Sequence, residues 1–146
     1  MTLDNLIGKN LEAITPDAAV IKRLLDAAVR NIADAQIDGL SNENQFDMAY
    51  KAIMQLANVA MQANGYRTLT SKPGHHQIMI QSLPKTVGLD VDQMIILDGL
   101  RKQRNVADYS GDLVVDSALA ECLVQAESLL DKVNAWLKEV HPDLMA

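Results

Sequence analysis

The sequence has few of the residues that interrupt helices and few aromatic residues. Its 146 residues include four prolines and seven glycines, and aromatic residues make up only 3%. The core must therefore be built from Ala, Leu, Ile, Val and Met, and regular structure has few places to break. Hydrophobic residues still make up 49%, which is enough for one core in a chain of single-domain length. This composition favours an all-helical domain over a sandwich of short strands.

The sequence also has a single cysteine and no long apolar run, and its net charge is negative. Cys122 is the only cysteine, which excludes an intrachain disulfide and a cysteine-based metal site. The formal net charge of −6 disfavours broad, non-specific nucleic-acid binding, although a local basic spot can still bind a short segment. No segment approaches the roughly 20 apolar residues of a membrane span, and no basic-then-apolar leader opens the chain. We therefore expect a cytoplasmic protein with no membrane association.

Apolar residues recur at helical spacing in the first half of the chain. The pattern predicts a helix that begins after an N-cap at Thr15, with Pro16 in its first turn. A second helix, capped by Ser41 or Asn42, is predicted to end near Gly65, which favours a left-handed turn. The segment YRTLTSKPG that follows is predicted to be a loop.

The second half of the chain predicts three further helices. One spans His75 to about Val87, and the next is capped by Asp90. The last is capped by Ser110 or Asp112 and runs to about Glu139. We expect these segments to form an all-α, up-and-down bundle of four to five helices. Residues 1–14 form an N-terminal arm in this prediction, and residues 15–141 form a single domain.

The segment LRKQRNVADYSGD departs from the acidic, apolar-striped character of the rest of the chain. On a helix, Arg101, Arg104, Asn105 and Asp108 share one face, because positions three and four apart are neighbours. One interpretation is a salt-bridged polar network that ties helices together, which would make the chain a non-catalytic protein-interaction module. The other is an anion site, since the guanidinium fork of arginine matches the geometry of phosphate.

Part of this segment resembles the HEPN domain superfamily (higher eukaryotes and prokaryotes nucleotide-binding). The usual mark of that superfamily is Arg, a polar residue that is often Asn, three further residues and His. Arg104 and Asn105 match the first two positions, and Tyr109 stands where the His is usual. The match lies at the junction of the last two predicted helices.

The resemblance implies binding of RNA or a nucleotide at the cleft of a homodimer. Many HEPN-like proteins are metal-independent endoribonucleases in which that His is central, so replacement by Tyr109 implies activity that is weak or lost. The candidate catalytic residues are Arg104, Asp108 and Tyr109. A toxin-like role, or a role as substrate-binding partner of a nucleotidyltransferase, is also implied.

Two adjacent histidines, His75 and His76, follow a Pro-Gly turn at the start of a predicted helix. They can decorate a surface turn, or their loop can approach Arg104 and supply the missing imidazole. The candidate ligand-binding residues are therefore Arg101, Arg104, Asn105, His75 and His76. Adjacent side chains on a helix point about 100° apart and make a poor metal pair. We expect no metal and no other cofactor.

Overall fold

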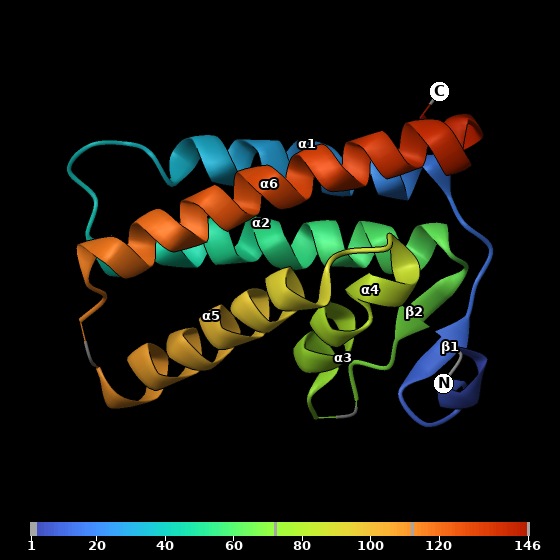
Figure 1. The fold of residues 1–146 in the computed structure, drawn as a ribbon, viewed down its shortest axis with the longest axis horizontal. Helices are drawn as coiled ribbons and strands as arrows, with labels where there is room; N and C mark the ends of the chain where they lie inside the picture. Colours follow the sequence, from blue (N-terminus) through green and yellow to red (C-terminus); the bar gives the residue numbers. More distant parts are fainter. Residues whose placement is uncertain (1–2, 72, 112, 146) are drawn as a thin grey trace.

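Four long helices form the body of the molecule, in a computed structural model that describes residues 3–71, 73–111 and 113–145. The side chains of two further residues, Asp108 and Tyr109, also lie outside the described part. The long helices are α1 (Ala18–Asp34), α2 (Asn42–Ala63), α5 (Val91–Ser110) and α6 (Asp116–Val140). Successive long helices run in opposite directions (Figure 1). The prediction of an all-α bundle is thus confirmed.

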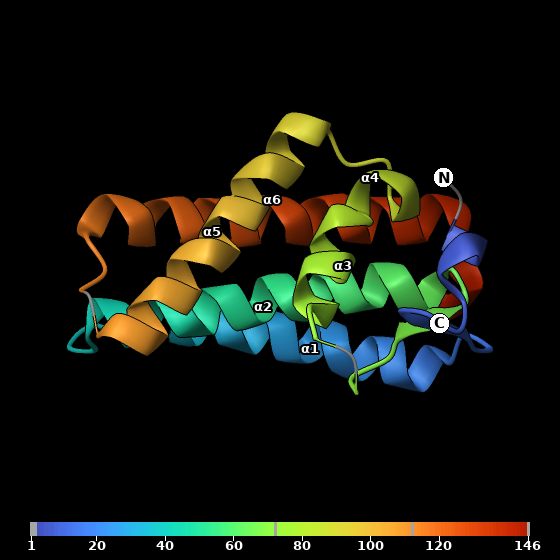
Figure 2. The same cartoon turned by 90° about the horizontal axis from the view of Figure 1, so that it is seen from below.

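The helices are arranged around α2. In Figure 1, α2 lies between the α1–α6 pair and α5, and Figure 2 shows α5 crossing α2 and α6 obliquely. The buried side chains of α2 include Phe46, the only phenylalanine, and a set of small residues: Ala49, Ala52, Ala57, Ala60 and Ala63. Small side chains reduce the distance between packed helices. They let α2 contact partners on several sides at once.

The predicted helix over His75–Val87 is divided into two short helices. They are α3 (His75–Gln81) and α4 (Leu83–Thr86), which are separated at Ser82. Pro84 lies in the first turn of α4, where the lack of an N–H has no cost, because that donor has no partner within the helix. The division turns the chain back toward the start of α5.

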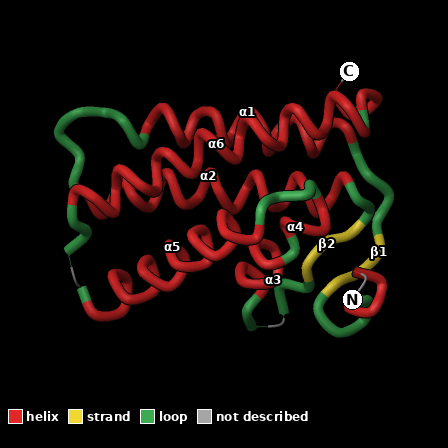
Figure 3. The backbone as a smooth tube through the Cα atoms, in the orientation of Figure 1, coloured by secondary structure: helices red, strands yellow, loops and turns green. Residues whose placement is uncertain are grey.

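The N-terminal arm is docked by a small sheet that the sequence pattern does not predict (Figure 3). β1 (Leu11–Ala13) pairs antiparallel with β2 (Tyr66–Thr68), so the prediction that the segment after Gly65 is entirely loop is wrong. The side chain of Leu11 is fully buried. The arm also contains the 3-10 turn η1 (Leu3–Leu6), and a second one, η2 (Pro142–Met145), follows α6.

Three of the predicted helix ends match the structure, whereas the predicted start of the first helix does not. Ser41 caps α2, Asp90 caps α5, and Gly65 has a positive φ of 88° after α2. The predicted cap at Thr15 is wrong, because the Asp17 side chain accepts the Ala19 N–H at 2.9 Å instead. The chain before Asp17 is held extended, since the N–H of residue 14 donates to the carbonyl of Gly65.

The last helix starts later than predicted. Ser110 belongs to α5 and donates its hydroxyl to the Val106 carbonyl, and Asp112, the other predicted cap, lies outside the described residues. Val114, which precedes the helix, is buried. Its carbonyl accepts a hydrogen bond of 3.0 Å from the Asn42 side chain. This anchor keeps the chain extended, so that α6 begins only at Asp116.

None of the described helices is both long enough and apolar enough to cross a membrane.

Candidate functional site

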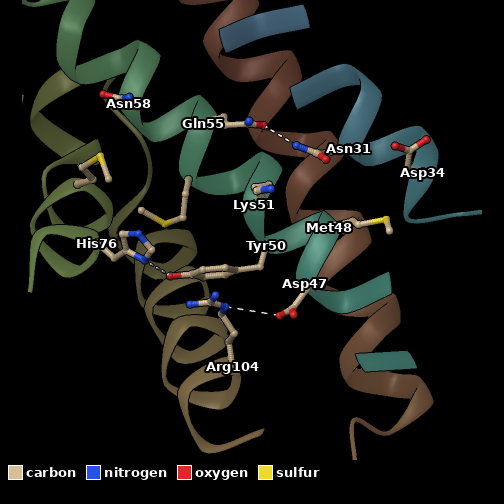
Figure 4. Close-up of a pocket in the computed structure, with 12 residues that line it drawn as sticks. Asn31, Asp34, Asp47, Met48, Tyr50, Lys51, Gln55, Asn58, His76 and Arg104 are labelled. Atoms are coloured by element: carbon tan, nitrogen blue, oxygen red, sulfur yellow. Dashed lines mark hydrogen bonds and ion pairs between the residues drawn. The ribbon is translucent and has the colours of Figure 1, made fainter. Parts of the chain in front are cut away.

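A pocket of about 580 Å³ opens between α2, α1, α3 and α5 (Figure 4). α2 forms its floor with residues at positions three or four apart, which lie on one helix face. α3 contributes His76 and α5 contributes Arg104. The lining residues are Asn31, Asp34, Asp47, Met48, Tyr50, Lys51, Met54, Gln55, Asn58, His76, Met79 and Arg104. The volume lies in the range of small-molecule sites.

Arg104, Tyr50 and His76 form the centre of one end of this pocket. The guanidinium carbon of Arg104 lies 5.1 Å from the centre of the Tyr50 ring, within the range of a cation–π contact. The Tyr50 hydroxyl is hydrogen-bonded to Nδ1 of His76 at 3.2 Å. The ring of His75 lies edge-on against that of His76. The arginine and one of the two histidines singled out in the sequence thus line the same pocket.

The environment favours the neutral forms of His76 and Tyr50. Burial, followed by the positive charges of neighbouring groups that include Arg104 and Arg101, lowers the pKa of His76. Burial raises the pKa of Tyr50 to about 12, against the opposing effect of the same two arginines. When the protonated hydroxyl donates to Nδ1, the imidazole carries its own proton on Nε2. That ring then presents a neutral donor beside a fixed cation.

Both signs of charge are present in the pocket. Arg104 Nε lies 3.5 Å from Asp47 Oδ1, and these two side chains are 32% and 48% exposed. Lys51 and Asp34 add one charge of each sign to the lining. Because the formal charges balance when His76 is neutral, the pocket suits a ligand with one anionic group better than a polyanion.

Arg101 belongs to a different environment, although it is only three residues from Arg104. Its Nε lies 2.8 Å from Asp98 Oδ1, and the two side chains are 14% and 12% exposed. Burial alone would raise the pKa of Asp98, but the hydrogen bond and charge of Arg101, with the charge of Lys102, lower it. Arg101 does not line the pocket. The structure gives it a buried partner rather than a place beside a ligand.

Of the remaining sequence candidates, the two whose side chains the structure describes do not line the pocket. Asn105 is exposed and is not part of the lining, and His75 contacts His76 without lining the pocket itself. The side chains of Asp108 and Tyr109, two of the candidate catalytic residues, lie outside the described part of the structure. Only Arg104 and His76 of the predicted ligand-binding set line the pocket.

Most of the pocket was not singled out by sequence analysis. Tyr50, Met54 and Met79 belong to the buried core as well as to the lining, so an apolar pattern assigns them to packing alone. The available signal was a polar row beside the apolar stripe of α2: Asp47, Lys51, Gln55 and Asn58. Such a row is also the ordinary pattern of a solvated helix face. It becomes informative only when a neighbouring helix lies across it.

No group of three or more His, Cys, Asp or Glu side chains is placed to hold a metal ion among the residues that the structure describes. Cys122 is buried, and burial raises the pKa of its thiol to about 12.

Comparison with known proteins gave no match: no protein-family model fits the chain, and neither a curated protein nor a solved structure matches it. The HEPN resemblance rests on the motif around Arg104 and on the helical setting, and it stays a prediction.

Proposed function

We propose that this chain is a HEPN-like helical domain that binds RNA or a nucleotide through Arg104. The observation that carries the proposal is the position of the guanidinium. It is 32% exposed at a pocket of about 580 Å³, rather than sealed in the bundle. Stacking on Tyr50 restricts its orientation. A restricted guanidinium loses less freedom when it binds a phosphate oxygen pair.

His76 supports the same proposal. A neutral imidazole beside the cation can donate a second hydrogen bond to an anion without adding a charge that must be desolvated. The proposal is one of binding, with ribonuclease activity weak or lost. His76 supplies an imidazole to the pocket, but it lies on α3. The motif in which HEPN-like proteins usually carry their His lies on α5 in this chain.

A homodimer is part of the proposal. α5 presents several apolar side chains to solvent, with 41–58% exposure: Val91, Ile95, Ile96 and Val106. A second copy packed along α5 would remove this surface from water. Because Arg104 belongs to the same helix, the two pockets would then lie near one interface. The nucleotidyltransferase partner implied by the resemblance stays a prediction.

A matched pair of substitutions on α5 tests the binding site. Arg104→Gln removes the cation of the pocket, and Lys102→Gln removes a 70% exposed cation outside the lining. We expect Arg104→Gln to weaken binding of a 5′-phosphorylated RNA hexamer or of nucleoside monophosphates by about tenfold or more, because a charge-assisted hydrogen bond contributes about 1.5–3 kcal/mol. Lys102→Gln should change the affinity by less than about twofold.

Fluorescence anisotropy at low and moderate salt provides the measurement, with thermal unfolding as the control for folding. A parent protein that binds neither RNA nor nucleotides at low salt would overturn the proposal. So would equal losses in the two variants, since these would indicate a diffuse charge effect.

The alternative function is a non-catalytic interaction module with a structural polar network. The buried Asp98–Arg101 pair favours it, because this part of the basic segment is committed to the fold. Under this alternative, Arg104→Gln lowers the free energy of unfolding and the parent protein has no nucleotide affinity to lose.

A further inference from the structure

The wall of the pocket away from Arg104 is built from side-chain amides. Asn31 of α1 and Gln55 of α2 are joined by a hydrogen bond of 2.8 Å, from Asn31 Nδ2 to Gln55 Oε1. Asn58 lies one turn further along α2, and its Oδ1 accepts a bond of 3.1 Å from Gln62. All three lining amides are half-buried, and Figure 4 shows them on the opposite side of the pocket from Arg104.

These hydrogen bonds orient the amides and leave part of each group available. Within the described residues, Gln55 Nε2, Asn58 Nδ2 and Asn31 Oδ1 have no hydrogen-bond partner from the protein. The wall therefore offers a ligand two N–H donor groups, on Gln55 and Asn58, and one acceptor oxygen, on Asn31. A mixed row of this kind complements the edge of a nitrogen heterocycle, which carries both donors and acceptors. An anion has only acceptors and cannot use all three groups.

Methionine side chains form the apolar part of the lining. Met48, Met54 and Met79 line the pocket, and Met54 and Met79 are only 7% exposed. Thioether side chains are polarizable and adapt to the shape of a flat ring. The pocket thus combines an apolar wall with a polar edge.

The length of the pocket separates the two kinds of contact. Tyr50, which lies beneath Arg104, and Asn58 are eight residues apart on α2, or about 12 Å along its axis. An isolated phosphate at Arg104 is too small to reach Asn58 across this distance. A phosphate joined through a sugar to a heterocycle can occupy both ends, and the balanced charges of the lining suit a single anionic group better than a long polyanion.

We infer that the ligand is a single nucleotide, with its phosphate at Arg104 and the edge of its base against Asn31, Gln55 and Asn58. The inference rests on the proposed function, because it takes the Arg104 end as the anion site. Under this inference, a single chain binds the whole nucleotide, and its affinity depends on the identity of the base.

The test compares ligands that contain one or both parts. Isothermal titration of the full chain uses the four ribonucleoside 5′-monophosphates, ribose 5-phosphate and the four nucleosides. We expect at least one nucleotide to bind about tenfold more tightly than ribose 5-phosphate, because only the nucleotide has a base edge that can hydrogen-bond to the amide wall. The corresponding nucleoside, which lacks the phosphate, should also bind more weakly than the nucleotide.

Substitutions at the amide wall then assign the base contact. Gln55→Ala and Asn58→Ala should reduce nucleotide affinity about five- to tenfold, toward that of ribose 5-phosphate, and leave the affinity for ribose 5-phosphate unchanged. Asn58→Asp, which keeps the shape but replaces a donor by an acceptor, should have at least the same effect. Gln77→Ala removes an exposed amide of α3 outside the lining and is the matched control.

The failures of the two proposals are distinguishable. If ribose 5-phosphate binds as tightly as every nucleotide, or if the amide variants retain parental nucleotide affinity, the base contact is overturned while the anion site at Arg104 stands. If ribose 5-phosphate, all nucleotides and the 5′-phosphorylated RNA hexamer fail to bind, the proposed function is overturned as well.

Discussion

The two arginines of α5 that lie one turn apart occupy contrasting regions of the molecule. Arg101 is 14% exposed and makes a close ion pair with Asp98, whereas Arg104 is 32% exposed, stacks on Tyr50 and lies 3.5 Å from Asp47. A buried pair adds to stability only while both partners are present. A half-exposed cation at a pocket can exchange its contact for a ligand. The comparison shows that two arginines of one sequence cluster have different environments, one in a buried ion pair and one at the rim of a pocket.

The largest expected effect comes from breaking the buried pair. Asp98→Ala leaves the Arg101 guanidinium without its carboxylate, and we expect a loss of about 3–5 kcal/mol in the free energy of unfolding. Because the pKa of Asp98 is lowered, the contribution of the pair is present above about pH 4 and disappears as the pH falls through the pKa of the folded state. Urea denaturation of the parent and the variant at pH 7 measures the loss of stability, and repeating it at lower pH measures how that loss depends on pH.

The control for this prediction is an exposed ion pair of the same type. Asp26→Ala removes the partner of Lys22, and these side chains are 52% and 71% exposed, so the change should stay below about 0.5 kcal/mol. Similar losses in the two variants would contradict the contrast between buried and exposed pairs.

A smaller effect is expected from the hydroxyl beneath Arg104. Tyr50→Phe keeps the ring under the guanidinium but removes the bond to His76, and we expect a loss of about 1 kcal/mol in unfolding free energy. Tyr66→Phe, which removes the exposed hydroxyl bonded to Asp4, is the matched control and should cost less. Equal stability of parent and Tyr50→Phe would show that the hydroxyl does not position His76.

The smallest effect concerns the protonation of His76. Because its pKa is lowered in the folded chain, the unfolded chain takes up a proton first as the pH falls below about 6.5. The contribution of the neutral imidazole is therefore present above that pH and is lost as the pH falls. Stability curves between pH 7.5 and 5 should be flatter for His76→Gln than for the parent. An NMR titration in which His76 protonates above pH 6.5 would contradict this.

The parts of the fold that were predictable depend on local pattern. Ser41 and Asp90 are followed at once by helical spacing, and their side chains cap the helices as expected. Thr15 was misjudged because a contact distant in sequence keeps the chain extended until Asp17. The β1–β2 pair joins Leu11 to Thr68, and three-residue strands are too short to show a period. Neither feature can be read from neighbouring residues.

The candidate site was predictable in part for the same reason. Arg104 and His76 are conspicuous residue types, and the structure places both at one pocket. Arg101 and Asn105 looked equivalent to Arg104, because spacing defines a helix face without showing what packs against it. From the sequence, Gln55 and Asn58 look like surface residues, and only the structure shows residues of α1 and α3 lining the same pocket.

The small sheet links the start of the chain to the pocket wall. β2 leaves α2 and leads through a short loop into α3, the helix that carries His76, while β1 holds β2 from the other side. β1 therefore fixes the segment that leads into α3, although β1 itself lines none of the pocket. If the chain binds a ligand as proposed, we expect a tag, truncation or binding event that displaces β1 to shift α3 and so to change the affinity.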